Sequence, residues 1–242
     1  MWHDSSKILG ILGGMGPLAT QLFYRMIIDC TDANKDQEHL DMIIFNHASL
    51  IDRTQAILTG HTEELYDTLL EDAKRMEASG ITSIAIPCNT SHLFVDRMQQ
   101  ELSIPIINMV RETTKVVAAS PRGIKTVAIL ATDGTIKSGL YQQACIDAGI
   151  NPVVPSESSQ KLVMKIIYDG IKSGGTIDYN DFIRIEGELA SKGCQGAILA
   201  CTELSCFKEQ FNLPDFYIDA MQVLAVRSIE SCGKKVKEQY RR

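Results

Sequence analysis

Two cysteines of this sequence each end an apolar run and are followed at once by polar residues. Cys88 lies in IAIPCNTSH (84–92), and Cys201 lies in AILACTELS (197–205). A thiol at the end of a strand and the start of a helix lies near free backbone N–H groups and the positive end of the helix dipole. This position is expected to lower the pKa of a cysteine from about 8.5 toward neutrality. Both thiols are therefore candidates for acid–base or nucleophilic chemistry.

Two thiols on opposite faces of one pocket would suit proton transfer at carbon. One thiolate would remove a proton, while the other cysteine, as a thiol, delivers a proton from the far side and inverts the carbon. The carbanion-like transition state would need hydrogen-bond donors at the adjacent carboxylate. Asn89, Thr90 and Thr202 are suitable donors.

The elements that must position these residues alternate along the chain. Short β-branched runs alternate with helix-period segments such as 62–79 and 181–192, a pattern that is typical of βαβ units and a mainly parallel sheet. The expected strands include KILGIL, DMIIFN, ITSIAI and PIINM in the first half, and KTVAIL, NPVVP, GAILA and DFYID in the second.

An internal repeat relates the two halves. KILGILGGMG (7–16) matches KTVAILATDG (125–134), and RMEASGITSIAIPCNT (75–90) matches ELASKGCQGAILACTE (188–203). We therefore predict an α/β protein of two similar doubly wound parallel-sheet domains related by pseudo-twofold symmetry.

The predicted first domain is 1–110 plus 219–242 and carries Cys88, and the second is 111–218 and carries Cys201. Ligands of parallel sheets bind beyond the carboxyl ends of the strands. The cysteines are therefore expected to face each other across an active-site cleft between the domains.

Three motifs identify a family resemblance. GGMGP (13–17), CNTSH (88–92) and CTE (201–203), in this order, resemble the aspartate/glutamate racemase family, and FNHASLIDRT (45–54) resembles its aspartate racemase branch. The resemblance extends along essentially the whole sequence. It implies a racemase for acidic amino acids, aspartate first and glutamate second, that needs no cofactor such as pyridoxal phosphate. It also implies a homodimer, and Cys88 and Cys201 as the two acid/base residues.

The resemblance further implies a set of substrate-binding residues. Asn89, Thr90, Thr202 and the loop of Met15 and Gly16 are expected at the α-carboxylate, Arg53 and Lys172 at the carboxylates, and Asp52 in an orienting role. The chain departs from the family pattern at three positions, with Ile51 for a proline, Ala200 for a glycine and Ser91 for the alanine of CNTAH. The first departure leaves open how the loop carrying Arg53 is placed.

Several roles have two interpretations. Lys165 lies two helical turns before Lys172 and could reach inward in its place. His92 either tunes the Cys88 thiol or caps and packs. Glu203 either orients groups near Cys201 or complements a helix N-terminus.

Composition limits the partners. The chain has 45% apolar residues, 22% charged residues and a formal charge of −6, and only GKKVKEQYRR (233–242) is locally basic. Nucleic acid and membrane are therefore poor partners. Seven cysteines without close CxxC pairing, and no signal-peptide pattern, predict a reducing cytoplasm. The histidines show no metal-ligand spacing, so no metal is expected.

Two other functions stay open at this point. A maleate isomerase or malonate decarboxylase-like enzyme of the same superfamily would use one cysteine as nucleophile or lone proton donor. A non-catalytic dicarboxylate-binding protein would keep the carboxylate contacts without turnover. Neither needs both thiols, which favours the racemase.

Overall fold

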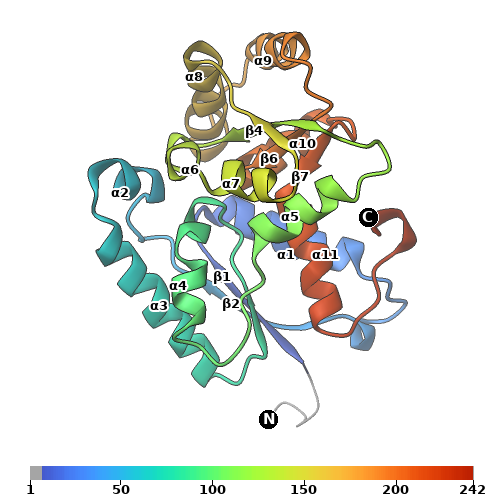
Figure 1. Ribbon diagram of the computed structural model, residues 1–242. Coiled ribbons are helices and arrows are strands. Elements are labelled where there is room, and N and C mark those ends of the chain that lie inside the picture. Colours follow the sequence, from blue (N-terminus) through green and yellow to red (C-terminus); the bar gives the residue numbers. More distant parts are fainter. Residues whose placement is uncertain (1–6, 242) are drawn as a thin grey trace. The chain divides into compact units, whose positions relative to one another are not determined.

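A computed structural model describes residues 7–241 of the chain. The chain forms two compact units, each containing one parallel sheet (Figure 1). Unit 1 contains the residues up to Met109 and those from Met221 onward, and unit 2 is Val110–Ala220. The predicted α/β class, with parallel sheets and alternating helices, is confirmed.

The sheet of unit 1 has the order β2-β1-β3. Its strands are β1 (Ile8–Gly13), β2 (Asp41–Asn46) and β3 (Ser83–Ala85), and they pair in parallel. The central strand β1 is buried along its whole length. The helices that accompany this sheet are α1 (Pro17–Cys30), α2 (Arg53–Thr59), α3 (Thr62–Ala78), α4 (Val95–Gln99) and α11 (Ala220–Ser231). Helix α3 packs against β1 and β2.

The sheet of unit 2 has the order β5-β4-β6-β7, also parallel. Its strands are β4 (Thr126–Ala131), β5 (Asn151–Val153), β6 (Gly196–Ala200) and β7 (Tyr217–Asp219). Its α-helices are α5 (Met109–Ala118), α6 (Asp133–Ser138), α7 (Leu140–Asp147), α8 (Glu157–Lys165), α9 (Tyr179–Ser191) and α10 (Thr202–Phe211). A π-helix, Ile166–Lys172, continues α8.

The two sheets repeat one strand order, with one difference. Where unit 2 has β7 beside β6, unit 1 has only a single parallel bridge between Ile84 and Ile106. The strand predicted at PIINM is therefore reduced to this bridge. Ile84 exchanges its two hydrogen bonds with Pro105 and Ile107, so the intervening Ile106 N–H faces away from β3 and donates to the Gln99 side chain at 2.7 Å. Helix α5 begins three residues after Ile106.

Helices α5 and α11 start at equivalent points of the repeat. Met109 lies three residues after Ile106, and Ala220 lies three residues after Tyr217, which pairs with Ala197 of β6. At each of these points the chain also passes from one unit to the other.

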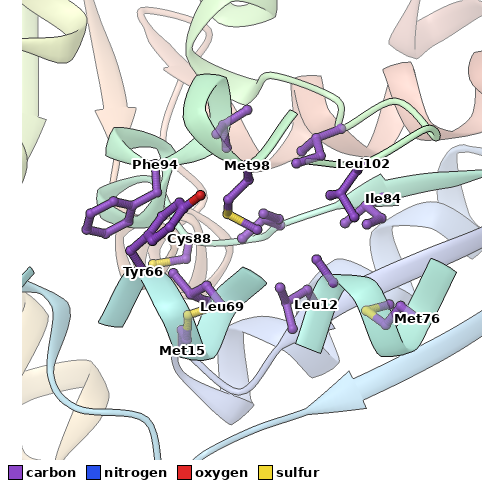
Figure 2. Close-up of a cluster of buried hydrophobic side chains, with 14 of the residues drawn as sticks. Leu12, Met15, Tyr66, Leu69, Met76, Ile84, Cys88, Phe94, Met98 and Leu102 are labelled. Carbon is purple, nitrogen blue, oxygen red and sulfur yellow. The ribbon is translucent and has the colours of Figure 1, made fainter. Parts of the chain in front are cut away.

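Each candidate cysteine belongs to the hydrophobic core of its own unit. Cys88 packs with Met15, Tyr66 and other apolar side chains, as Figure 2 shows. Cys201 belongs to the corresponding cluster of unit 2. No helix within residues 7–241 is both long and apolar enough to cross a bilayer.

Candidate functional site

The glycine-rich turn after β1 is built for close packing of the backbone. Gly14 has φ +93°, and a Cβ added there would lie 2.5 Å from the backbone of His47. Thr20 fixes the turn, because its Oγ1 accepts from the Gly14 N–H at 2.9 Å and donates to the Gly16 carbonyl at 3.0 Å. The Met15 side chain is only 2% exposed and packs in the core. This turn can therefore present backbone groups, rather than the Met15 side chain, to a ligand.

The Cys88 thiol lies beside a hydroxyl donor. Ser91 Oγ lies 3.2 Å from Cys88 Sγ and 3.3 Å from Met15 Sδ, and donates toward both sulfur atoms. Ser91 belongs to a 3₁₀ helix, Thr90–Leu93, that begins two residues after Cys88. One hydroxyl thus connects the cysteine to the glycine-rich turn.

His92 contacts the backbone of Cys88 and not its thiol. Its Nδ1 lies 2.9 Å from the Cys88 carbonyl oxygen, and its Nε2 accepts from the Met109 N–H at 3.0 Å. This network assigns the proton to Nδ1, which donates to the carbonyl. Burial lowers the pKa of His92 and keeps the ring neutral. Of the two interpretations, the structure supports a packing and bridging role at the start of α5.

Arg53 is a buried cation with a free hydrogen-bonding edge. Asp52 caps helix α2 by accepting from the Gln55 N–H at 2.9 Å, and Arg53 follows as the first residue of the helix. The Arg53 side chain is 8% exposed, its Nη1 donates to the Ile51 carbonyl at 3.1 Å, and its Nε has no hydrogen-bond partner. A buried guanidinium with an unpartnered N–H is suited to receive an anion such as a carboxylate.

The Cys201 thiol has the opposite kind of partner. It donates to Glu203 Oε2 at 2.9 Å, and the Thr202 hydroxyl donates to the same oxygen at 3.3 Å. Burial, followed by the charge of Glu203, raises the pKa of Cys201 well above its usual value, although the Lys172 ammonium opposes the shift. This corrects the direction expected from the helix dipole for Cys201, since burial and a neighbouring carboxylate outweigh the N-terminus of α10.

Lys172, rather than Lys165, lies beside the second cysteine. Lys172 Nζ is 3.7 Å from Glu203 Oε1 and 4.6 Å from the centre of the Tyr168 ring. Lys165 pairs with Asp181 at 2.7 Å, and its side chain is 53% exposed. The π-helix ends at Lys172, and π-helical segments occur frequently at functional sites.

The other predicted binding residues are buried within the same turns as the cysteines. Asn89, Thr90, Thr202 and Glu203 all have buried side chains. Each unit therefore carries a cysteine with adjacent amide or hydroxyl groups at the carboxyl end of a strand. Sequence reasoning did not identify Ser91 as a partner of the thiol or Tyr168 as a partner of Lys172. Within residues 7–241, no group of three or more His, Cys, Asp and Glu side chains is arranged to hold a metal ion.

A family model of the Asp/Glu/Hydantoin racemases matches residues 12–227 of the chain. The chain belongs to this family. The predicted resemblance is thereby confirmed, and it covers both cysteine motifs and the glycine-rich turn.

Relatives agree with this assignment. The broad specificity amino-acid racemase RacX of Bacillus subtilis (strain 168) is 28% identical over 229 residues, which cover 93% of this chain and 97% of RacX. The solved structure of Picrophilus torridus aspartate racemase has 31% identity and a TM-score of 0.83, with 97% of each chain covered. Glutamate racemase from Francisella tularensis subsp. tularensis SCHU S4, in complex with D-glutamate, shares the fold at 21% identity, with a TM-score of 0.68 over 94% of this chain and 80% of that chain.

Proposed function

We propose that this protein is an aspartate racemase, with glutamate as a second substrate, that transfers protons at Cα between Cys88 and Cys201 without pyridoxal phosphate. Membership of the racemase family supports the reaction class. The observation that carries the mechanism is the unlike pairing of the two thiols. Cys88 lies beside the Ser91 hydroxyl donor, whereas Cys201 donates to the Glu203 carboxylate.

These partners suit a base and an acid. A hydroxyl donor stabilises a thiolate, while a carboxylate acceptor stabilises a protonated thiol. In one direction Cys88, as thiolate, takes the α-proton and becomes a thiol, and Cys201 gives its proton to the opposite face of Cα and becomes a thiolate. The product is the other enantiomer, and the reverse direction exchanges the two roles. The proposal requires both sulfurs to reach the same carbon.

Carboxylate recognition follows from the buried cations and donors. Arg53 has an unpartnered Nε and suits one carboxylate of an acidic amino acid. Lys172 provides a second positive charge near Cys201. Asn89, Thr90 and Thr202, with the backbone of the Met15-Gly16 turn, supply neutral donors for the charge that develops on the α-carboxylate. Two cations favour a dicarboxylic substrate over a neutral amino acid.

The proposal also includes a cytoplasmic homodimer that uses no metal. The cytoplasmic site rests on the cysteine usage and the composition of the chain, and the homodimer on the family resemblance.

Incubation with single-enantiomer amino acids in D₂O tests the function. Aspartate should lose its optical purity and gain solvent deuterium at Cα, read by chiral chromatography and NMR. Glutamate should follow more slowly, and alanine should stay unchanged. If no amino acid in a broad panel exchanges its α-proton, the protein is not a racemase. Racemisation of neutral amino acids at the rate of aspartate would contradict the carboxylate-recognition roles.

A further inference from the structure

The Ser91 hydroxyl has two sulfur atoms as hydrogen-bond acceptors. It is fully buried, at 0% exposed, and lies 3.2 Å from Cys88 Sγ and 3.3 Å from Met15 Sδ. A hydroxyl has one proton, so it donates fully to only one acceptor at a time. A thioether is a weak acceptor, whereas a hydrogen bond to a charged group is markedly stronger. The proton of Ser91 should therefore turn to Cys88 whenever Cys88 is a thiolate.

The two candidate sulfur atoms have different hydrogen-bond partners: the Ser91 hydroxyl at Cys88 and the Glu203 carboxylate at Cys201. Within unit 1, the titratable neighbours of Cys88 include Tyr66, which belongs to the same apolar cluster, and His92, which bonds the Cys88 carbonyl oxygen. His92 is held neutral by burial and itself faces Asp96. Ser91 is a polar side chain that contacts the Cys88 sulfur directly.

We infer that Ser91 is a positioning residue that holds Cys88 as the base in the resting protein. This inference rests on the proposed function, because it assigns the starting protonation state of the same two thiols. When Cys88 takes the α-proton, a new S–H bond replaces the Cα–H bond and the sulfur becomes neutral. The Ser91 hydroxyl then turns to Met15 Sδ, and it returns when Cys88 gives up its proton. Ser91 keeps its own proton throughout, and the proton that reaches the opposite face of Cα still comes from Cys201.

The test compares the alkylation of individual cysteines in wild type and in Ser91→Ala. Each protein is treated with iodoacetamide across a range of pH, and peptide mass spectrometry reads the rate at each cysteine. In Ser91→Ala the rate at Cys88 near pH 7 should fall about tenfold, the value of one hydrogen bond to a charged group. The rate at Cys201 should change by less than about twofold, because its partner is Glu203.

Two further variants separate this role from a general packing effect. Ser91→Thr keeps the hydroxyl and should restore most of the Cys88 rate. Ser205→Ala is the matched control, since Ser205 is a buried serine at 1% exposed on the helix that follows the other cysteine. Its hydroxyl donates to Asp219 at 2.7 Å and not to sulfur. It should leave the Cys88 rate unchanged.

Kinetics give an independent readout. The acidic limb of the kcat/KM profile for aspartate should move to higher pH in Ser91→Ala, equally for both enantiomers because the equilibrium constant of a racemisation is one. An unchanged Cys88 alkylation rate in Ser91→Ala, or an equal fall at Cys88 and Cys201, would overturn the inference. If wild type racemises nothing and the Cys88 rate still falls selectively, the proposed function fails and the assignment of Ser91 stands.

Discussion

Replacing Arg53 with leucine tests how this protein selects its substrate. The Arg53 guanidinium is buried, and its Nη1 is held by the Ile51 carbonyl. Its Nε has no partner, so this N–H and the neighbouring Nη2 form an edge that can meet both oxygens of a carboxylate. Leucine keeps an apolar stem in the same place and removes that edge. The perturbation is therefore confined to the anion contact and to one bond with a carbonyl.

The magnitude follows from the hydrogen bonds that are lost. A hydrogen bond to a charged group contributes about 1.5–3 kcal/mol, and the two bonds of a bidentate pair do not add fully. We expect Arg53→Leu to lose about 2–4 kcal/mol of transition-state binding, or about 30- to 1000-fold in kcat/KM for aspartate. Arg53→Lys should recover only part of this loss, because an ammonium lacks the planar fork.

Stability should respond differently from activity. Leucine removes a buried donor that has no partner, which offsets the lost bond to Ile51, so the free energy of unfolding should change by no more than about 1 kcal/mol. The assay pairs racemisation kinetics, followed by circular dichroism at a single wavelength, with urea unfolding of each variant. Wild-type kcat/KM in Arg53→Leu would refute the reasoning. A large loss of stability that accounts for the loss of activity would refute it equally.

Three further predictions concern the cysteines and their neighbours. Cys88→Ala and Cys201→Ala should each abolish racemisation in both directions. Each variant should retain slow α-proton exchange in D₂O with one aspartate enantiomer, and the two variants should prefer opposite enantiomers. Near-normal racemisation by either variant would exclude the two-base mechanism. Glu203→Gln should raise the alkylation rate of Cys201 at neutral pH, because burial alone then opposes the thiolate, and an unchanged rate would show that Glu203 contributes nothing. Burial lowers the pKa of His92 in the folded state. Below the ordinary histidine pKa of about 6.5, the unfolded state therefore binds more protons than the folded state. The free energy of unfolding should fall with decreasing pH, by at most about 1.4 kcal/mol per pH unit. Urea unfolding of wild type and His92→Gln should be measured between about pH 7.5 and about pH 5. The free energy of unfolding should depend more steeply on pH in wild type, and parallel curves would contradict this assignment.

The sequence predicted the architecture because the signals for it are local and repeated. Alternating strand and helix periods specify parallel sheets, and the repeat places a cysteine at the end of β6 and just beyond β3. The shortened pairing at Ile106 was not predicted, because PIINM has the apolar, β-branched composition of a strand, and the length of a ladder depends on packing that composition does not describe.

The chemistry of the thiols was harder to predict. A serine in place of alanine at position 91 looks like a small change, and only the fold places its hydroxyl within reach of both Cys88 and Met15. The helix dipole alone would lower the pKa of Cys201, but the thiol is buried and the Glu203 side chain accepts its hydrogen bond, and both raise that pKa. Side-chain direction and desolvation arise from packing, which residue spacing alone does not describe.

The starting points of α5 and α11 have a consequence for the two repeated halves. The helix that follows the first half-chain belongs to unit 2, from Val110 onward, and the helix that follows the second belongs to unit 1, from Met221 onward. The halves have therefore exchanged their last helices, as two subunits do in a domain-swapped dimer. Cutting the chain between Met109 and Val110 would leave unit 1 without α11, whose residues Leu224 and Ile229 are fully buried. Neither repeated half therefore carries all the residues of one compact unit.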